Sequence, residues 1–81
     1  RFMRLDKYLK VSRLIKRRTV ANEACDGGRV MINDKPAKAS TNVKVGDVIT
    51  IAFGNKEVKV EVLDVAETVR KENAAEMFKY V

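Results

Sequence analysis

The side chains of this sequence that could do chemistry are mainly guanidinium and ammonium groups, and they gather at its start. Residues 1–18 hold eight Lys and Arg residues and one acid, so the segment carries a net charge of +7. The whole chain of 81 residues carries +6, which leaves residues 19–81 at −1. Apolar residues between the cations can anchor this segment to a core. A basic surface fixed to a folded body suits a polyanion, and nucleic acid is the first interpretation.

The residue types that are missing exclude much catalytic chemistry. Histidine is absent, so the chain has no Cys/His zinc set, no histidine general base and no Ser-His-Asp arrangement. No segment resembles a glycine-rich phosphate loop or a carboxylate pair of recognisable spacing. We therefore expect a protein that is not an enzyme, with no catalytic residues, no cofactor and no bound metal.

Length and cysteine content indicate one small domain in a reducing compartment. A chain of this size buries only a little over ~60% of its unfolded surface. The single cysteine, Cys25, cannot form an internal disulfide, which favours the cytoplasm. No apolar run approaches the ~18 residues that would span a bilayer, and no signal-peptide pattern is present. We expect no membrane partner.

The basic segment has helical periodicity. From Leu5 the apolar residues recur in steps of three and four, and Asp6 sits in the first turn, where it favours the helix dipole. If this helix continued, Lys10, Arg13 and Arg17 would share one face. Runs of charged residues usually form only a solvated surface. This run has almost no compensating acid, which favours a functional role for its cations.

A second helix is expected directly after the basic segment. Thr19 is typical of an N-cap, residues 20–26 follow as helix, and Gly27-Gly28 ends it. The cations of residues 16–18 then precede a helix N-terminus, where backbone N–H groups also attract phosphate. Cys25 is expected in the core.

The rest of the chain predicts a small sheet and a terminal helix. Strands are expected at residues 29–32, 48–53 and 58–65, with an edge strand at 35–38 that holds Pro36. Asn33-Asp34 and Gly54-Asn55 indicate tight turns. Residues 39–45 read as a polar connection, and residues 70–81 as a helix with Ala74, Met77, Phe78 and Val81 on its apolar face.

Several blocks of residues together resemble one known family, the S-four RNA-binding domain. The blocks are Arg4-Leu5-Asp6-Lys7-Tyr8-Leu9, Ser12-Arg13, Arg18-Thr19-x-Ala21, Gly28-Arg29-Val30-x-Ile32-Asn33, Lys38-Ala39-Ser40 and Val45-Gly46-Asp47-Val48-Ile49. The resemblance implies an α+β fold of the αL type, with two N-terminal helices packed on a small, mostly antiparallel sheet. We expect a single RNA-binding domain over residues 1–81. Its core would be residues 4–51, and residues 48–81 would add a β-hairpin and a C-terminal helix. Residues 1–2 precede a methionine and could be left over from cloning.

Nearly the whole chain also resembles two related groups of stand-alone bacterial proteins. These are the RqcP group of ribosome-associated quality-control factors, which the basic run of residues 10–18 favours, and the heat-shock protein fifteen group. The resemblance implies action on large ribosomal subunits that carry a stalled nascent chain. The implied partners are ribosomal RNA, the tRNA of the obstructed peptidyl-tRNA and a factor that recruits alanyl-tRNA. The implied role is to support addition of a C-terminal alanine tail.

The same resemblance implies which cations contact RNA. They are Arg4, Lys7, Lys10, Arg13, Lys16, Arg17, Arg18 and Lys38. Arginine can fork two N–H groups onto a phosphate and can stack on bases, so Arg13, Arg17 and Arg18 are the strongest candidates. Asp6 either orients Arg4 or Lys7, or only starts the helix. Base-specific readout is not expected, because the period of the helix puts Tyr8 in the core.

Three alternatives stay open at this point. One is a heat-shock-type RNA-binding protein that recycles ribosomes, and another is an RNA-binding module that serves an RNA-modifying enzyme on a separate chain. The third is an adaptor whose basic face binds an acidic protein. We also expect a monomer, because few apolar positions are predicted to be exposed.

Overall fold

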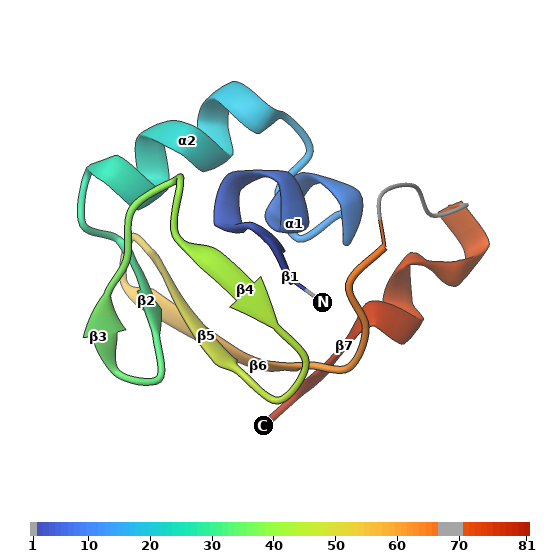
Figure 1. Cartoon of the computed structure of the whole chain (residues 1–81). Coiled ribbons are helices and arrows are strands. Elements are labelled where there is room, and N and C mark those ends of the chain that lie inside the picture. Colours follow the sequence, from blue (N-terminus) through green and yellow to red (C-terminus); the bar gives the residue numbers. More distant parts are fainter. Residues whose placement is uncertain (1, 67–70) are drawn as a thin grey trace.

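The computed structural model describes residues 2–66 and 71–81. The elements in chain order are β1 (Phe2–Arg4), α1 (Leu5–Val11), α2 (Arg18–Asp26), β2 (Val30–Ile32), β3 (Lys35–Pro36), β4 (Asn42–Lys44), β5 (Val48–Phe53), β6 (Lys56–Val62), the 3₁₀ helix η1 (Lys71–Met77) and β7 (Phe78–Tyr80). The larger sheet has the order β3-β2-β5-β6-β7 and is antiparallel throughout. Both α-helices lie on one side of this sheet (Figure 1). The expected α+β class, with two N-terminal helices on an antiparallel sheet, is confirmed.

The core lies between the helices and the inner face of the sheet. From α1 it takes Leu5, Tyr8 and Leu9, all fully buried. From β5 it takes Ile49 and Ile51, which the strand's alternation points at the helices. None of the helices in the described part of the chain is long and apolar enough to cross a membrane.

α1 is shorter than its periodicity suggested. It ends at Val11, and Arg13 takes a left-handed backbone conformation with φ 65°. The Ile15 N–H then donates to the Leu9 carbonyl over 3.0 Å, which turns the chain back onto the end of the helix. The expectation that a continued helix aligns Lys10, Arg13 and Arg17 is therefore wrong. Leu14 and Ile15 contact the core from a loop. Apolar periodicity alone cannot distinguish such a loop from a continued helix.

α2 begins one residue before the expected cap. Arg17 is the N-cap, with extended φ and ψ and no side-chain cap bond, and Thr19 lies inside the helix. The end of α2 is as expected, because Gly27 is the C-cap and Gly28 has φ 81°. Gly27 has a steric reason too, since a Cβ there would lie 2.8 Å from the Glu23 carbonyl oxygen.

The first hairpin of the large sheet is confirmed. Asn33 and Asp34 both have positive φ, as a tight turn of this kind requires. Asn33 also donates its amide to Asp47 and accepts the Val48 N–H, so its side chain fixes the turn against β5. Pro36 lies on β3, at the edge of the sheet, where its missing N–H leaves no ladder bond unmade.

A short second ladder was missed. β4 pairs antiparallel with β1, from Phe2 opposite Lys44 to Arg4 opposite Asn42. The interpretation of residues 39–45 as a plain connection is therefore wrong, and Phe2, one of the two residues ascribed to cloning, belongs to β1. Three residues with one buried side chain between two exposed ones give too short an alternation to identify a strand.

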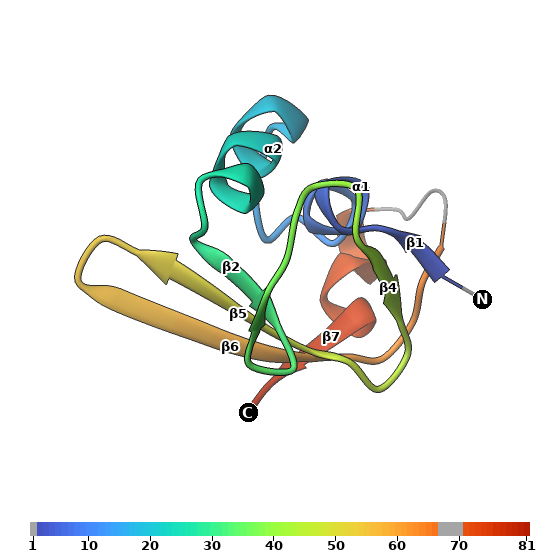
Figure 2. The ribbon, with the colours of Figure 1, turned by 60° about the vertical axis from the view of Figure 1, so that its left-hand side comes forward.

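The second hairpin extends beyond the helices. β5 and β6 pair over six residues, and their turn at Gly54 projects away from the body of the molecule below α2 (Figure 2). β6 begins at Lys56 and ends at Val62, three residues before the expected end.

The C-terminal segment differs from the expected helix. η1 is a 3₁₀ helix that ends at Met77, and Phe78–Tyr80 then forms β7 on the edge of β6. The start of the expected helix at residue 70 lies outside the described residues. Ala74 and Met77 are buried as expected, but Val81 is exposed. The edge of β6 that does not pair with β5 offers a row of backbone N–H and C=O groups. Pairing with this edge satisfies backbone groups that a helix end would leave without a partner.

Candidate nucleic-acid interface

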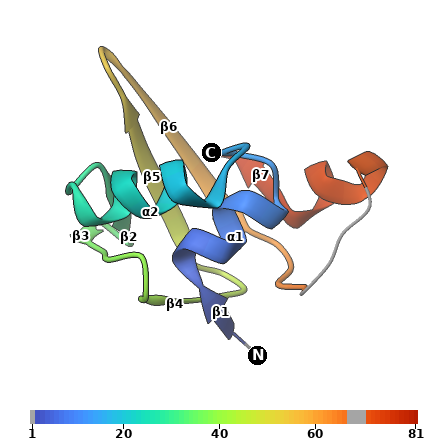
Figure 3. The same ribbon diagram turned by 90° about the horizontal axis from the view of Figure 1, so that it is seen from above.

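The eight predicted cations come from four stretches of the chain. Arg4 ends β1, Lys7 and Lys10 lie on α1, Arg13 to Arg18 cover the α1–α2 connection and the start of α2, and Lys38 lies between β3 and β4. All are exposed except Lys7, which is half-buried. Seen from above the helices, α1 and α2 lie side by side, and β1 leads into the start of α1 (Figure 3).

Two of these arginines meet on one buried acid. Arg4 donates Nε and Nη2 to the two Asp6 carboxylate oxygens at 3.1 and 3.2 Å, which is a two-pronged contact. From α2, Arg18 places Nε 3.4 Å and Nη2 3.5 Å from the same carboxylate. The Asp6 side chain is only 2% exposed, whereas Arg4 and Arg18 are 49% and 50% exposed. Each arginine therefore keeps about half of its side-chain surface open to a ligand.

Further hydrogen bonds hold Asp6 in place. Its Oδ1 accepts the Lys7 N–H at 2.7 Å, and its Oδ2 accepts the Asn22 amide at 3.3 Å. Burial raises the pKa of the Asp6 carboxyl, but the hydrogen bonds from Arg4, Asn22 and Arg18 and the charge of Arg18 outweigh it. The net effect is a pKa below the usual value, so the group is ionised at neutral pH. Of the two roles considered for Asp6, orienting Arg4 is confirmed, and it also starts α1.

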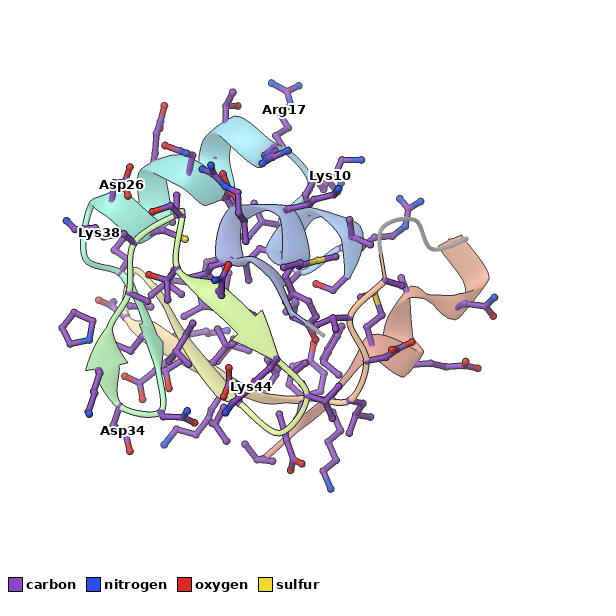
Figure 4. The ribbon with its side chains drawn as sticks, viewed as in Figure 1. Lys10, Arg17, Asp26, Asp34, Lys38 and Lys44 are labelled. Atoms are coloured by element: carbon purple, nitrogen blue, oxygen red, sulfur yellow. The ribbon has the colours of Figure 1, made fainter. Side chains whose placement is uncertain are left out.

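The α1–α2 connection presents the next group of cations. Arg13, Lys16 and Arg17 are exposed, and none makes a side-chain hydrogen bond or ion pair with the described part of the chain. The left-handed turn at Arg13, rather than a common helix face, sets their directions. Lys10 and Arg17 both point outward on the helix side of the molecule (Figure 4).

Lys38 stands apart from this group. The loop that carries it is tied to the C-terminal end of α2, where the Asp26 carboxylate accepts the Ala39 N–H at 3.1 Å. Arg17 is the N-cap at the other end of this nine-residue helix, ~13.5 Å away along its axis. Figure 4 shows Lys38 on the side of the molecule where α2 ends, away from Arg17. The structure does not bring Lys38 together with the arginines.

Residue patterns alone did not find Asn22 or the contact between Asp6 and Arg18. That contact spans twelve residues and depends on how α1 packs against α2. One signal was present, because Asp6 is the only acid among residues 1–18. A lone acid within a run of cations has several potential partners.

Metal binding and thiol chemistry find no suitable site among the described residues. No three His, Cys, Asp or Glu residues among them are placed to hold a metal. Burial raises the pKa of the Cys25 thiol to about 11, with smaller contributions from the charges of Asp6 and Asp26. A fully buried thiol in that state is a poor nucleophile. Binding through cations is the chemistry that this surface supports.

Comparison with known families agrees with this geometry. The model of the S4 domain matches residues 3–49, which include the last two residues of β1, both helices, β2 to β4 and the start of β5. The chain belongs to the S4 domain family. In this S4 domain, all eight of the predicted cations fall inside the matched range.

Relatives of this S4 domain match over nearly its whole length. Two proteins called RQC P-site tRNA stabilizing factor, from Halalkalibacterium halodurans and Bacillus subtilis, are each 58% identical to it. The matches cover 95% and 94% of this chain and 88% of each relative. The trimeric structure of Vibrio cholerae heat shock protein 15 is also similar, with a TM-score of 0.91 at 29% identity. That match covers 100% of this chain and 83% of the Vibrio protein.

Proposed function

We propose that this S4 domain is a non-enzymatic RNA-binding factor of the cytoplasm that acts on the large ribosomal subunit. It would contact ribosomal RNA and the tRNA of a stalled peptidyl-tRNA. Arg4, Lys7, Lys10, Arg13, Lys16, Arg17 and Arg18 would carry these contacts, with Lys38 at the margin. The names of its 58% identical relatives support the tRNA part of the proposal.

The observation that carries the proposal is the paired arginines on Asp6. One buried carboxylate fixes guanidinium groups from β1 and α2 on the same surface, with about half of each side chain still exposed. Groups held in this way lose less conformational freedom when they bind a phosphate than freely moving side chains do. Two guanidinium groups held at fixed positions suit the backbone of a folded RNA better than that of a flexible single strand.

The finer role that we propose is support for the addition of a C-terminal alanine tail to the stalled chain. In that role the domain would hold the P-site tRNA while a separate factor recruits alanyl-tRNA. A monomer is sufficient for this function, because the cationic surface lies within one chain. Light scattering of the isolated protein would test whether it is a monomer in solution.

The first experiment is co-sedimentation of tagged protein with ribosomal subunits at two salt concentrations, followed by sequencing of the bound tRNA. We expect recovery with large subunits, enrichment of tRNA and weaker recovery at higher salt. Recovery with acidic proteins after nuclease treatment would instead favour an adaptor and contradict the proposal.

Two variants make this experiment specific to the surface. Arg17→Ala and Lys44→Ala each remove one exposed cation, but Arg17 lies on the helix side and Lys44 lies at the opposite end of the molecule (Figure 4). We expect Arg17→Ala to reduce recovery and Lys44→Ala to leave it unchanged. An equal loss in both would mean that total charge, rather than this surface, drives binding.

A heat-shock-type role in recycling ribosomes is the second candidate. The TM-score of 0.91 with the Vibrio cholerae protein favours it, whereas the higher identity of the tRNA-stabilizing relatives favours the first role. Sequencing of the co-sedimented tRNA distinguishes them. Large subunits recovered without enriched tRNA would support the second candidate.

A further inference from the structure

An open groove lies between α2 and the projecting β5–β6 hairpin. Its volume is about 310 Å³, within the ~300–1,000 Å³ typical of small-ligand sites. Leu14 and Ile15 from the α1–α2 connection contribute to its apolar lining. Val20 on α2 and Phe53 on β5 form its two walls, and they are 49% and 46% exposed. Figure 2 shows the hairpin extending away from the body of the molecule below α2.

Two cations and one acid also line the groove. Lys16 belongs to the cation-rich connection described above, and Arg29 lies between α2 and β2. Glu23 is the acid, from α2. The groove is therefore continuous with the proposed RNA surface through Lys16, and its charged lining is net positive.

This combination of groups matches one class of ligand. A nucleobase has an apolar π-face that stacks on aromatic rings. Its edge carries amino groups that donate hydrogen bonds to a carboxylate. The attached phosphate requires a cation, which Lys16 or Arg29 can supply. An apolar protein side chain would use the walls but would gain nothing from two cations.

We propose that this groove binds one unpaired nucleotide, extruded from the RNA that the helix side of the molecule contacts. The base stacks on the Phe53 ring between the two walls, and its phosphate pairs with Lys16 and Arg29. This inference rests on the proposed RNA-binding function and adds a site for single-stranded RNA to it. The only aromatic considered for base contact from the sequence, Tyr8, is fully buried. Phe53 lies 37 residues after Lys16 in the chain, and only the fold brings both to one groove.

The test compares two RNA hairpins that share the same paired stem and loop, one without a bulge and one with a single additional fluorescent adenine analogue bulged from the stem. We expect wild-type protein to bind the bulged hairpin about tenfold more tightly and to quench the bulged base by stacking. Phe53→Ala should remove both effects and leave binding to the paired hairpin unchanged. Phe53→Trp should retain both, because a larger ring still stacks.

Tyr80→Ala is the matched control, since Tyr80 is an aromatic residue with 70% exposure that lies outside the groove. It should leave both hairpins unaffected. Equal wild-type affinity for the two hairpins, or a bulge preference that survives Phe53→Ala, would overturn this inference while RNA binding stands. Loss of ribosome binding in Phe53→Ala with both hairpins bound as before would assign the groove to a protein partner. Failure of wild-type protein to bind either hairpin would overturn the proposed function, and this inference with it.

Discussion

A single acid organises the cationic surface at the scale of residues. The Asp6 carboxylate is almost fully buried. It accepts five hydrogen bonds, which come from the Lys7 backbone and from the side chains of Arg4, Arg18 and Asn22. A buried carboxylate is stable only when paired and hydrogen-bonded, and this one is. Arg18 is consequently a poor probe of RNA contact alone. Replacing it by alanine would also remove a partner of a buried charge, whereas Arg17 has no such role.

Asp6→Asn should destabilise the protein at neutral pH by about 1–2 kcal/mol. The change removes charge-assisted hydrogen bonds, and the cost stays moderate because water can still reach both arginines. The Asp6 pKa in the folded state lies below its ordinary value, so this stability is present above the unfolded pKa and is lost as pH falls through the folded pKa. Urea unfolding at neutral and acidic pH measures it, and the difference from wild type should shrink in acid.

Asp34→Asn is the matched control for this change. Asp34 has the same side chain, but it is 81% exposed, and asparagine accepts its left-handed backbone conformation. It should leave stability nearly unchanged at both pH values. A difference between Asp6→Asn and wild type that stayed constant into acid would contradict an ionised Asp6 as the source.

Long-range contacts place the helices at the scale of elements. α1 is joined to η1 by the Tyr8 hydroxyl, which donates to the Met77 carbonyl at 2.7 Å across 69 residues. Met77 O also accepts the Leu63 N–H at 2.7 Å and the Asp64 N–H at 3.2 Å. One carbonyl thus connects the first helix, the end of β6 and the last helix, which holds the C-terminal segment against the N-terminal core.

Tyr8→Phe should lower the free energy of unfolding by about 1 kcal/mol. It removes one buried hydrogen bond but keeps the ring, and Met77 O retains its other two donors, so no carbonyl is left unpaired. Burial and the nearby charge of Asp64 raise the pKa of Tyr8, so wild-type stability should also fall as pH rises above ~10. Urea titration measures both effects.

The comparison for Tyr8 is Tyr80→Phe. Tyr80 stacks edge-on against Phe78 with ring centroids 5.5 Å apart, a contact that phenylalanine can keep, and its exposed hydroxyl makes no hydrogen bond to the described residues that the change would remove. We expect no measurable change in stability. If Tyr8→Phe and Tyr80→Phe had the same free energy of unfolding, the hydrogen bond of the Tyr8 hydroxyl would contribute nothing to stability.

Charge is unevenly distributed at the scale of the whole molecule. Residues 1–18 carry a net +7, while the remainder of the chain is close to neutral. The two helices and the connection between them, which hold most of these cations, lie on one side of the large sheet. Binding to RNA through such a surface releases counterions from the phosphates, so affinity depends on salt in proportion to the number of contacts.

Binding of a fully paired RNA hairpin should weaken steeply as salt rises. If ~4–6 phosphates are neutralised, the logarithm of the binding constant should fall with the logarithm of salt concentration with a slope of about −3 to −5. Arg17→Ala should reduce that slope by about one, because it removes one phosphate contact. Fluorescence anisotropy over a salt series measures it. A wild-type constant that does not change between low and physiological salt would contradict phosphate-driven binding.

Local patterns determined much of this protein without any structure. The number and position of the cations, the start of α1, the glycine end of α2 and the Asn33-Asp34 turn all depend on neighbours within a few residues. The family blocks in residues 4–51 are local in the same sense, and the S4 model confirms them. The absence of histidine likewise restricted the chemistry by composition alone.

Only the tertiary structure decided which of these groups act together. The Asp6 contacts with Arg18, the β1–β4 ladder, the Tyr8 bond to Met77 and the groove between Lys16 and Phe53 all join residues far apart in the chain. The end of α1 at Arg13 and the switch from helix to strand after Met77 belong here too, because packing and free strand edges outweighed local periodicity. Periodicity specifies which face of a segment is apolar, but the partner of that face is set by the free energy of the whole packed chain.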